Sequence, residues 1–182
     1  MKGFLKAEDC FLLIIDPQEK LMAVVNEPDR VKKNISLLIH LAKTFKLPIV
    51  PTTQYAKGLG PYVPEIASLL EGLTFFDKTE FSALKNEAIA REIRSLGRKT
   101  MILCGVETHI CVYQTALSGL LEGFRVVVAA DATSSRTQEN VAYGLFRLRD
   151  LGADVVSTEM IVYELLERAG TPEFKTLLAY LK

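Results

Sequence analysis

The sequence predicts an α/β protein with three layers: a six-stranded, mainly parallel sheet with helices on both faces. Short apolar runs rich in β-branched residues alternate along the chain with longer amphipathic runs, the pattern of successive βα units. The short runs are apolar on both faces, as strands are when helices cover both sides of a parallel sheet. The chain has 182 residues, 49% of them hydrophobic and 24% charged. We therefore expect a single domain spanning residues 1–182.

Six segments have the composition of buried strands. The first, at 10–16 (CFLLIID), is apolar until its last residue, and the fifth, at 125–130 (RVVVAA), is rich in valine. The second contains Pro51, which lacks a backbone donor, so we expect that strand to end there. In chain order the expected strands are 10–16, 48–53, 73–77, 100–105, 125–130 and 153–157.

Amphipathic runs separate these strands, and several begin at residues that favour a helix start. Proline suits the first turn of a helix, and a serine or threonine side chain can cap it. The expected start residues are Pro28, Ser82, Thr137 and Thr171. A further helix is expected over 109–122, ended by Gly123. Residues 54–64 contain two Gly and two Pro and are expected to form a loop.

Composition and charge exclude several classes of protein. The 22 Lys and Arg residues balance 22 Asp and Glu residues, so no extended basic surface for nucleic acid is expected. The apolar runs are far shorter than the roughly 20 residues that cross a bilayer, so no membrane partner is expected. The first nine residues lack the apolar stretch of a secretion signal, and three cysteines form no disulfide framework. We expect a cytoplasmic protein with reduced thiols.

Chemically active side chains follow three of the expected strands. The carboxyl ends of parallel strands meet at one edge of the sheet, where ligands bind. Asp16 follows the first strand, Lys78 the third and Cys111 the fourth. Cys111 should lie in the first turn of a helix, where free N–H groups and the helix dipole favour a thiolate. Burial of Asp16 would raise its pKa and let it accept the thiol proton.

Each of these three residues also has an ordinary structural interpretation. Taken alone, Cys111 is equally consistent with a buried and inert thiol. Asp16 alone suits a carboxylate that caps a turn, and Lys78 alone suits a solvated surface amine. Cys10 and Cys104 lie inside apolar strands, and we expect both to be inert.

The sequence predicts no metal site and no cofactor. The two histidines, His40 and His109, are far apart, and no spacing typical of a zinc site occurs. On a helix, His109 and Cys111 would be about 200° apart, so His109 is not placed to act as a base for the thiol. Neither a glycine-rich phosphate loop nor a G-x-S-x-G turn is present, which leaves dinucleotide binding and serine hydrolysis without a motif.

Four motifs stand in order at the ends of the expected strands. They are Asp-Pro-Gln at 16–18, Lys-Thr-Glu-Phe-Ser at 78–82, Gly-Val-Glu-Thr-His-Ile-Cys at 105–111 and Asp-Ala-Thr-Ser-Ser-Arg at 131–136. With them the chain resembles the isochorismatase-like hydrolase family, which includes nicotinamidases and N-carbamoylsarcosine amidohydrolases. The resemblance extends over about residues 10–160.

The resemblance implies a triad of Asp16, Lys78 and Cys111. In it Cys111 attacks a carbonyl carbon, Asp16 moves protons, and Lys78 polarises the pair. The resemblance also implies a cis peptide bond between Val106 and Glu107, which would direct backbone N–H groups toward a developing oxyanion. The residues expected to contact the substrate are Gln18, Gln54, Tyr55, Phe81 and Thr108.

The segment after the second strand departs from the nicotinamidase pattern. Nicotinamidases have metal-binding Asp and His residues there, whereas this chain has Thr52, Thr53, Gln54 and Tyr55. In this segment the chain therefore resembles the metal-free members of the family, many of which have no assigned substrate.

Three interpretations of function remain open at this point. The leading one is hydrolysis of a small amide, carbamoyl or related carbonyl substrate, a C–N bond in the first place, through a cysteine thioester. The second is isochorismatase-type vinyl-ether hydrolysis, in which Asp16 protonates the substrate and no acyl-enzyme forms. The third is a non-catalytic oligomeric scaffold. Because the family usually associates, we expect a homo-oligomer in each case.

Overall fold

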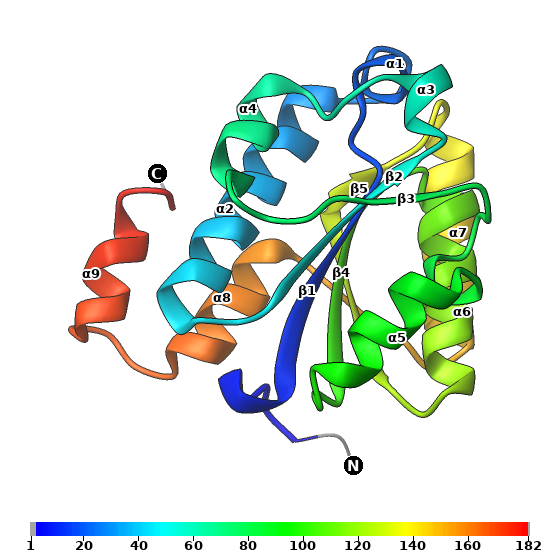
Figure 1. Cartoon of the computed structure of the whole chain (residues 1–182). Coiled ribbons are helices and arrows are strands. Elements are labelled where there is room, and N and C mark those ends of the chain that lie inside the picture. The colour runs from blue at the N-terminus through cyan, green and yellow to red at the C-terminus, as the bar shows by residue number, and fades with distance from the viewer. Residues whose placement is uncertain (1–2, 182) are drawn as a thin grey trace.

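A computed structural model describes residues 3–181 and contains a six-stranded sheet with helices around it (Figure 1). The strand order is β3-β2-β1-β4-β5-β6, and the neighbouring strands pair in parallel. The order reverses between β1 and β4, and in such sheets ligands bind beside this reversal. The strands are β1 (Cys10–Ile15), β2 (Ile49–Gln54), β3 (Phe76–Lys78), β4 (Thr100–Val106), β5 (Arg125–Ser134) and β6 (Asp154–Val156). The fold class predicted from the sequence is confirmed.

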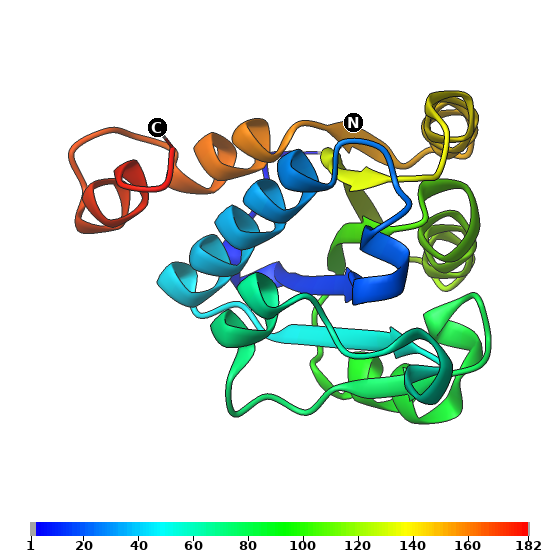
Figure 2. The ribbon, with the colours of Figure 1, turned by 90° about the horizontal axis from the view of Figure 1, so that it is seen from above.

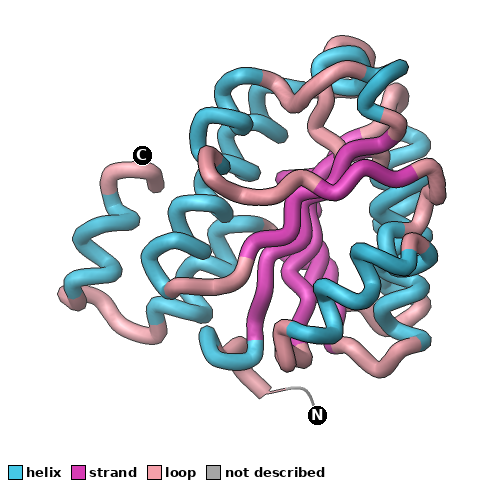
Figure 3. The backbone as a smooth tube through the Cα atoms, in the orientation of Figure 1, coloured by secondary structure: helices cyan, strands magenta, loops and turns pink. Residues whose placement is uncertain are grey.

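Helices cover both faces of the sheet. On one side lie α2, α4, α8 and α9, and on the other lie α5, α6 and α7 (Figures 2 and 3). The bounds are α1 (Glu19–Met22), α2 (Pro28–Phe45), α3 (Ala56–Leu59), α4 (Pro64–Ala67), α5 (Glu87–Ser95), α6 (Tyr113–Leu121), α7 (Gln138–Asp150), α8 (Thr158–Leu166) and α9 (Pro172–Leu178). None of these helices has both the length and the hydropathy of a bilayer-crossing segment.

The central strand β1 shows how one short sequence supplies both cores. All six of its residues are buried, and its side chains alternate between the two faces. Leu12 and Ile14 join the apolar cluster under α2, whereas Leu13 and Ile15 join the cluster under α5 and α6. A strand that is apolar throughout is therefore required at this place.

Several element boundaries differ from the prediction. The fifth strand continues to Ser134 and does not end at residue 130, and the segment 54–64, expected to be a loop, contains the short helix α3. Pro51 lies inside β2 and does not end it. The reason is that β3 pairs only with residues 52–54 of β2, so the missing N–H of Pro51 lies beside an unpaired stretch. The third strand begins at Phe76 and not at Leu73.

The helix starts were predicted in part. Thr137 and Thr171 cap α7 and α9, each accepting a hydrogen bond from a backbone N–H. Ser82 does not cap α5: its hydroxyl lies 2.8 Å from that of Ser118. Asn86, four residues later, accepts from the N–H groups of the first turn. A 3₁₀ turn separates Ser82 from the helix, and this turn moves the start to Asn86.

Candidate active site

The ends of β1, β3 and β4 bring the predicted groups together at one edge of the sheet. Asp16 follows β1 directly and has a left-handed backbone conformation (φ 52°) that turns the chain. Lys78 is the last residue of β3 and pairs with Gln54 in the neighbouring strand. Cys111 lies in a π-helical turn (Thr108–Val112) between β4 and α6. Three strand ends thus supply a carboxylate, an amine and a thiol.

Asp16 and Lys78 form a fully buried ion pair. The Lys78 Nζ atom is 2.7 Å from Asp16 Oδ2, and neither side chain is exposed. Thr52 Oγ1 donates to the other carboxylate oxygen, Oδ1, at 2.7 Å. Burial raises the pKa of Asp16 above its usual value, and the charge of Lys78 opposes this rise. The result is a carboxylate that is more basic than one in water.

The Cys111 thiol lies next to this ion pair. The residue is 6% exposed, and its side chain is close enough to Asp16 for the charge of the carboxylate to act on the thiol. Burial, followed by the negative charge of Asp16, raises the pKa of Cys111 to about 12, against the effect of Lys78. The expectation that the start of a helix holds a resting thiolate is therefore wrong, because burial and the adjacent carboxylate dominate at this position.

Gln54 links the amine to the thiol. Its Oε1 atom accepts a hydrogen bond from Lys78 Nζ at 2.6 Å and lies 4.0 Å from Cys111 Sγ. Its Nε2 atom donates to the Thr79 carbonyl oxygen at 2.9 Å, which fixes which end of the amide faces Lys78. Gln54 was predicted as a substrate contact, and the structure places it inside the polar cluster.

The side chain of Gln18 forms hydrogen bonds with the backbone of Gln54 and Gly60, beside the site. It is fully buried; its Oε1 atom accepts from the Gln54 N–H, and its Nε2 atom donates to the carbonyls of Gln54 and Gly60. Both N–H groups of its amide are thus used. This geometry does not support the predicted contact between Gln18 and a substrate, because the side chain is committed to the backbone.

The other predicted substrate contacts lie in different environments. Tyr55 and Phe81 are 52% and 53% exposed. Thr108 is fully buried, and its hydroxyl has no hydrogen-bond partner among residues 3–181. Contacts of these three residues with a substrate stay predictions.

The turn that carries Cys111 is held by close backbone packing. The peptide bond between Val106 and Glu107 is cis, at the position that the family resemblance indicates. Before it, Gly105 has φ +112°, and a Cβ atom there would be 2.0 Å from the Ile15 carbonyl oxygen. Gly144 of α7 lets that helix approach the backbone of Thr108, because a Cβ atom would meet it at 3.1 Å. Side chains are thus excluded at two points around the turn.

Sequence reasoning missed the groups that hold the site together. Through their side chains Thr52 contacts Asp16, Arg136 contacts Glu107, and Ser135 contacts His109 in the turn that carries Cys111. Ser135 and Arg136 belong to the motif at 131–136, which does not indicate what they contact. Thr52 has a more specific sequence signal, because it ends the apolar part of β2, in register with Ile15. The parallel pairing therefore places it beside Asp16.

The other two cysteines are free thiols within the sheet. Cys10 and Cys104 are fully buried. Burial raises the pKa of Cys10 to about 11 and that of Cys104 further. Among residues 3–181 no group of three or more His, Cys, Asp or Glu side chains is arranged to hold a metal ion.

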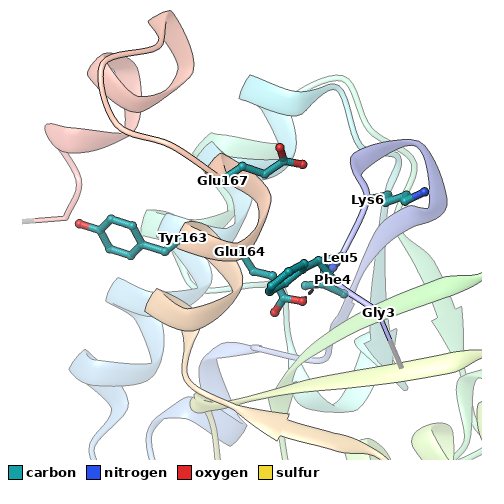
Figure 4. Close-up of a pocket in the computed structure, with 7 residues that line it drawn as sticks. All are labelled: Gly3, Phe4, Leu5, Lys6, Tyr163, Glu164 and Glu167. Carbon is teal, nitrogen blue, oxygen red and sulfur yellow. Dashed lines mark hydrogen bonds between the residues drawn. The ribbon is translucent and has the colours of Figure 1, made fainter. Parts of the chain in front are cut away.

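A separate cavity of about 470 Å³ lies between the N-terminal segment and α8 (Figure 4). It is formed by residues 3–6 together with Tyr163, Glu164 and Glu167. Because residues 3–6 precede β1, this cavity is near the amino end of the strand, whereas Asp16 follows the carboxyl end. It contains none of the predicted site residues.

The fold and the site together define a doubly wound α/β protein with a buried Asp–Lys pair beside a cysteine at the point where strand order reverses. The family model "Isochorismatase domain" matches residues 10–160. The chain belongs to this isochorismatase-like hydrolase family, as the sequence motifs predicted.

Individual relatives cover nearly the whole chain. The secreted isochorismatase effector Isc1 of Phytophthora sojae is 36% identical over 99% of this chain and 88% of its own length. The YcaC gene product of Escherichia coli, described as an octameric hydrolase of unknown specificity, is 30% identical with a TM-score of 0.92, over 99% and 91% of the two chains. YcaC from Pseudomonas aeruginosa, solved with hexane-2,5-diol and covalent acrylamide, is 28% identical with a TM-score of 0.92, over 100% and 95%.

Proposed function

We propose that this protein hydrolyses a C–N bond in a small amide, carbamoyl or related carbonyl compound, with Cys111 as the nucleophile. The observation that carries the proposal is the buried Asp16–Lys78 pair next to the Cys111 thiol, which Gln54 joins to Lys78. A buried ion pair contributes little to stability by itself. A cluster of this kind at a strand-order reversal is better explained by chemistry.

The first half of the reaction forms a thioester. Asp16 accepts the thiol proton while Sγ attacks the carbonyl carbon, so a resting thiol with a raised pKa is activated only as it reacts. Lys78 compensates the charge that stays in the cluster. When the tetrahedral intermediate collapses, the C–N bond breaks and the protonated Asp16 transfers its proton to the leaving nitrogen.

The second half of the reaction regenerates the thiol. Asp16 takes a proton from water, the resulting hydroxide attacks the thioester, and the C–S bond breaks. The proton then returns from Asp16 to Sγ, and the acid product leaves. The oxyanion donors proposed for both halves are backbone N–H groups of the turn at 107–111. The Ile110 N–H is not one of them, because it donates to the Glu107 carbonyl.

One observation favours a second candidate, vinyl-ether hydrolysis. The pKa of Asp16 is raised by burial, so this residue can also act as a proton donor to a substrate carbon. In that reaction Cys111 has no covalent role. The two candidates therefore differ in what happens when the thiol is removed.

The experiment compares Cys111→Ala with Asp16→Ala on one substrate. A screen of small amides, carbamoyl compounds and isochorismate provides that substrate, and samples are quenched in acid during the first turnovers for intact-protein mass. A mass increase equal to the acyl group, absent from Cys111→Ala, supports the thioester. Full activity of Cys111→Ala without an adduct contradicts it and favours proton transfer by Asp16. Activity on none of the compounds favours the scaffold interpretation.

Assembly and location are part of the same proposal. The octameric relative supports a homo-oligomer. We propose cytoplasmic residence because the three cysteines are unpaired thiols. The similar Phytophthora protein is named as secreted, so location is tested separately, by fractionating the source cells and detecting the protein with an antibody.

A further inference from the structure

The loop between β5 and α7 contacts the turn that carries Cys111. Arg136, in this loop, donates from its backbone N–H and from Nε to the same Glu107 oxygen, Oε2, at 3.0 Å in each case. Glu107 is buried, while the Arg136 side chain is 57% exposed. A surface arginine is therefore attached to a buried carboxylate four residues before Cys111.

Both the side chain and the backbone carbonyl of Glu107 are hydrogen-bonded. Its carboxylate binds Arg136, and its backbone carbonyl accepts the N–H groups of Ile110 and Val112 at 3.1 and 3.2 Å. Ile110 and Val112 flank Cys111 in the chain. A change in the position of Glu107 would therefore move the backbone of Ile110 and Val112, on both sides of Cys111.

A second contact joins the same two segments. His109 Nδ1 lies 2.9 Å from the hydroxyl of Ser135, which is fully buried. Two adjacent loop residues therefore contact the turn: Ser135 contacts His109, and Arg136 contacts Glu107. Two attachments fix both the position and the tilt of the turn, which one attachment would not.

Charge gives the arginine an additional effect. Asp16 and Glu107 face Cys111 as negative charges, and Lys78 faces it as a positive charge. The Arg136 guanidinium partly compensates Glu107. Of the two hydrogen bonds that Arg136 donates to the Glu107 carboxylate, loss of the guanidinium would leave the one from the backbone N–H.

We propose that Arg136 is a positioning residue, which acts through Glu107 to hold the turn at 107–111 so that the Cys111 thiol is aligned for attack. The inference rests on the proposed role of Cys111 as the nucleophile. It assigns a function to a side chain that need not touch the substrate.

The test measures the rate at which acrylamide, a neutral electrophile, modifies Cys111, with peptide mass spectrometry as the readout. No substrate is needed. Arg136→Ala should slow the reaction about tenfold, because misplacement of a reacting atom by a fraction of an ångström has effects of this size. Arg136→Lys should recover part of the rate, since it keeps the charge without the planar fork. Arg147→Ala, which removes an exposed arginine of α7, is the matched control and should react as the wild type does.

A double-mutant cycle separates positioning from direct contact. Glu107→Gln removes the charged acceptor, so adding Arg136→Ala to it should change the rate by less than about twofold. A tenfold loss in the Glu107→Gln background would overturn the inference, because Arg136 would then act elsewhere. An unchanged rate in Arg136→Ala would also overturn it. If Arg136→Ala does not fold, Arg136→Lys with Glu107→Gln gives the same comparison.

The controls distinguish this inference from the proposed function. Preferential modification of Cys111 in the wild-type protein tests the nucleophile itself. If Cys111 does not react in the wild type, the proposed function fails. If it reacts and the Arg136 variants react equally fast, only the positioning role fails. Thermal unfolding of each variant identifies losses of rate that come from loss of structure.

Discussion

Lys78 supplies the positive charge that compensates the buried carboxylate of Asp16, because both side chains lie where water cannot reach them. Removing one member of a buried ion pair leaves the other charge unpaired and costs about 3–5 kcal/mol. The effect on Asp16 has a defined pH dependence. Without Lys78, burial raises the pKa of Asp16 further above the 3.8 of the free side chain. The folded protein then holds a proton that the unfolded chain releases, so stability falls as pH rises through the folded-state pKa.

We therefore predict that Lys78→Met lowers the free energy of unfolding by about 3 kcal/mol, and by more at pH 8 than at pH 5. Urea unfolding at the two pH values measures this. Lys32→Ala is the control, because Lys32 is at the surface, where it pairs with Asp29 and Glu65. It should have little effect at either pH. A loss for Lys78→Met that is larger at pH 5 would contradict the assigned cause.

Among the three thiols, Cys111 should be the only one that reacts fast. Cys10 and Cys104 are completely buried, whereas Cys111 retains a small exposed area. We predict that brief, substoichiometric iodoacetamide labels Cys111 first. The rate should rise from pH 6 to pH 9 without a plateau, because the thiol pKa is about 12. Peptide mass spectrometry provides the measurement, and equal labelling of Cys10 or Cys104 would refute the prediction.

At the residue scale, the sequence predicted that Asp16, Lys78 and Cys111 lie together, but it did not predict the hydrogen bonds that hold the surrounding side chains in place. Asp16, Lys78 and Cys111 come together because parallel strands end at one edge, which a sequence pattern can indicate. The hydrogen bonds of Gln18 to backbone atoms and of Arg136 to Glu107 depend on rotamers and on loop paths. Both residues belong to the motifs at 16–18 and 131–136, but these motifs do not specify the partners of the two side chains.

Among the elements, the backbone of β4 lies close against that of β1 at Gly105. The backbone there has φ +112°, and an added Cβ atom would overlap the Ile15 carbonyl oxygen. We predict that Gly105→Ala lowers the free energy of unfolding by about 3 kcal/mol or more, from strain and overlap together. Gly123→Ala is the matched control: φ is +85°, and no atom lies within 4 Å of the added carbon. Its cost should be about 1 kcal/mol, from the backbone conformation alone.

Urea unfolding of both glycine variants tests this difference. If the two variants lose equal stability, the close approach of β4 to β1 does not restrict residue 105. The result also bears on the site, because Gly105 directly precedes the cis peptide bond at Val106–Glu107.

Element boundaries show what a local pattern does and does not contain. Thr137 and Thr171 were identified as caps because a threonine before an amphipathic run has few competing roles. Ser82 has a neighbour, Ser118, that is distant in sequence, and Asn86 offers a better cap. The position of Pro51 within β2 depends on where β3 begins to pair, which is a property of the sheet and not of β2.

At the scale of the whole molecule, the surface retains large apolar side chains that one chain does not cover. Tyr143 and Phe146 on α7 and Met160 on α8 are mostly exposed. Phe146 and Met160 also line one groove, together with β6 at the edge of the sheet. Because a similar hydrolase is octameric, the occupant that we propose for this surface is a second copy of the chain.

We predict a homo-oligomer at micromolar concentration, measured by light scattering. Phe146→Glu combined with Met160→Glu should shift the mass toward that of one chain, because charges would then be buried between copies. Phe4→Glu, which changes an exposed side chain at the N-terminal segment, is the control and should leave the mass unchanged. A single-chain mass of 20.2 kDa for the unaltered protein would contradict the prediction.

The position of Lys78 on β3 has a consequence for motion. β3 has three residues and is one of the two edge strands of the sheet, paired with β2. Segments of this kind open locally far more often than a central strand such as β1. Each opening withdraws the ammonium group from Asp16, and each closing restores it. We therefore expect the fraction of time for which the cluster stays assembled to follow the opening equilibrium of these three residues, which amide hydrogen exchange at Asp77 and Lys78 measures.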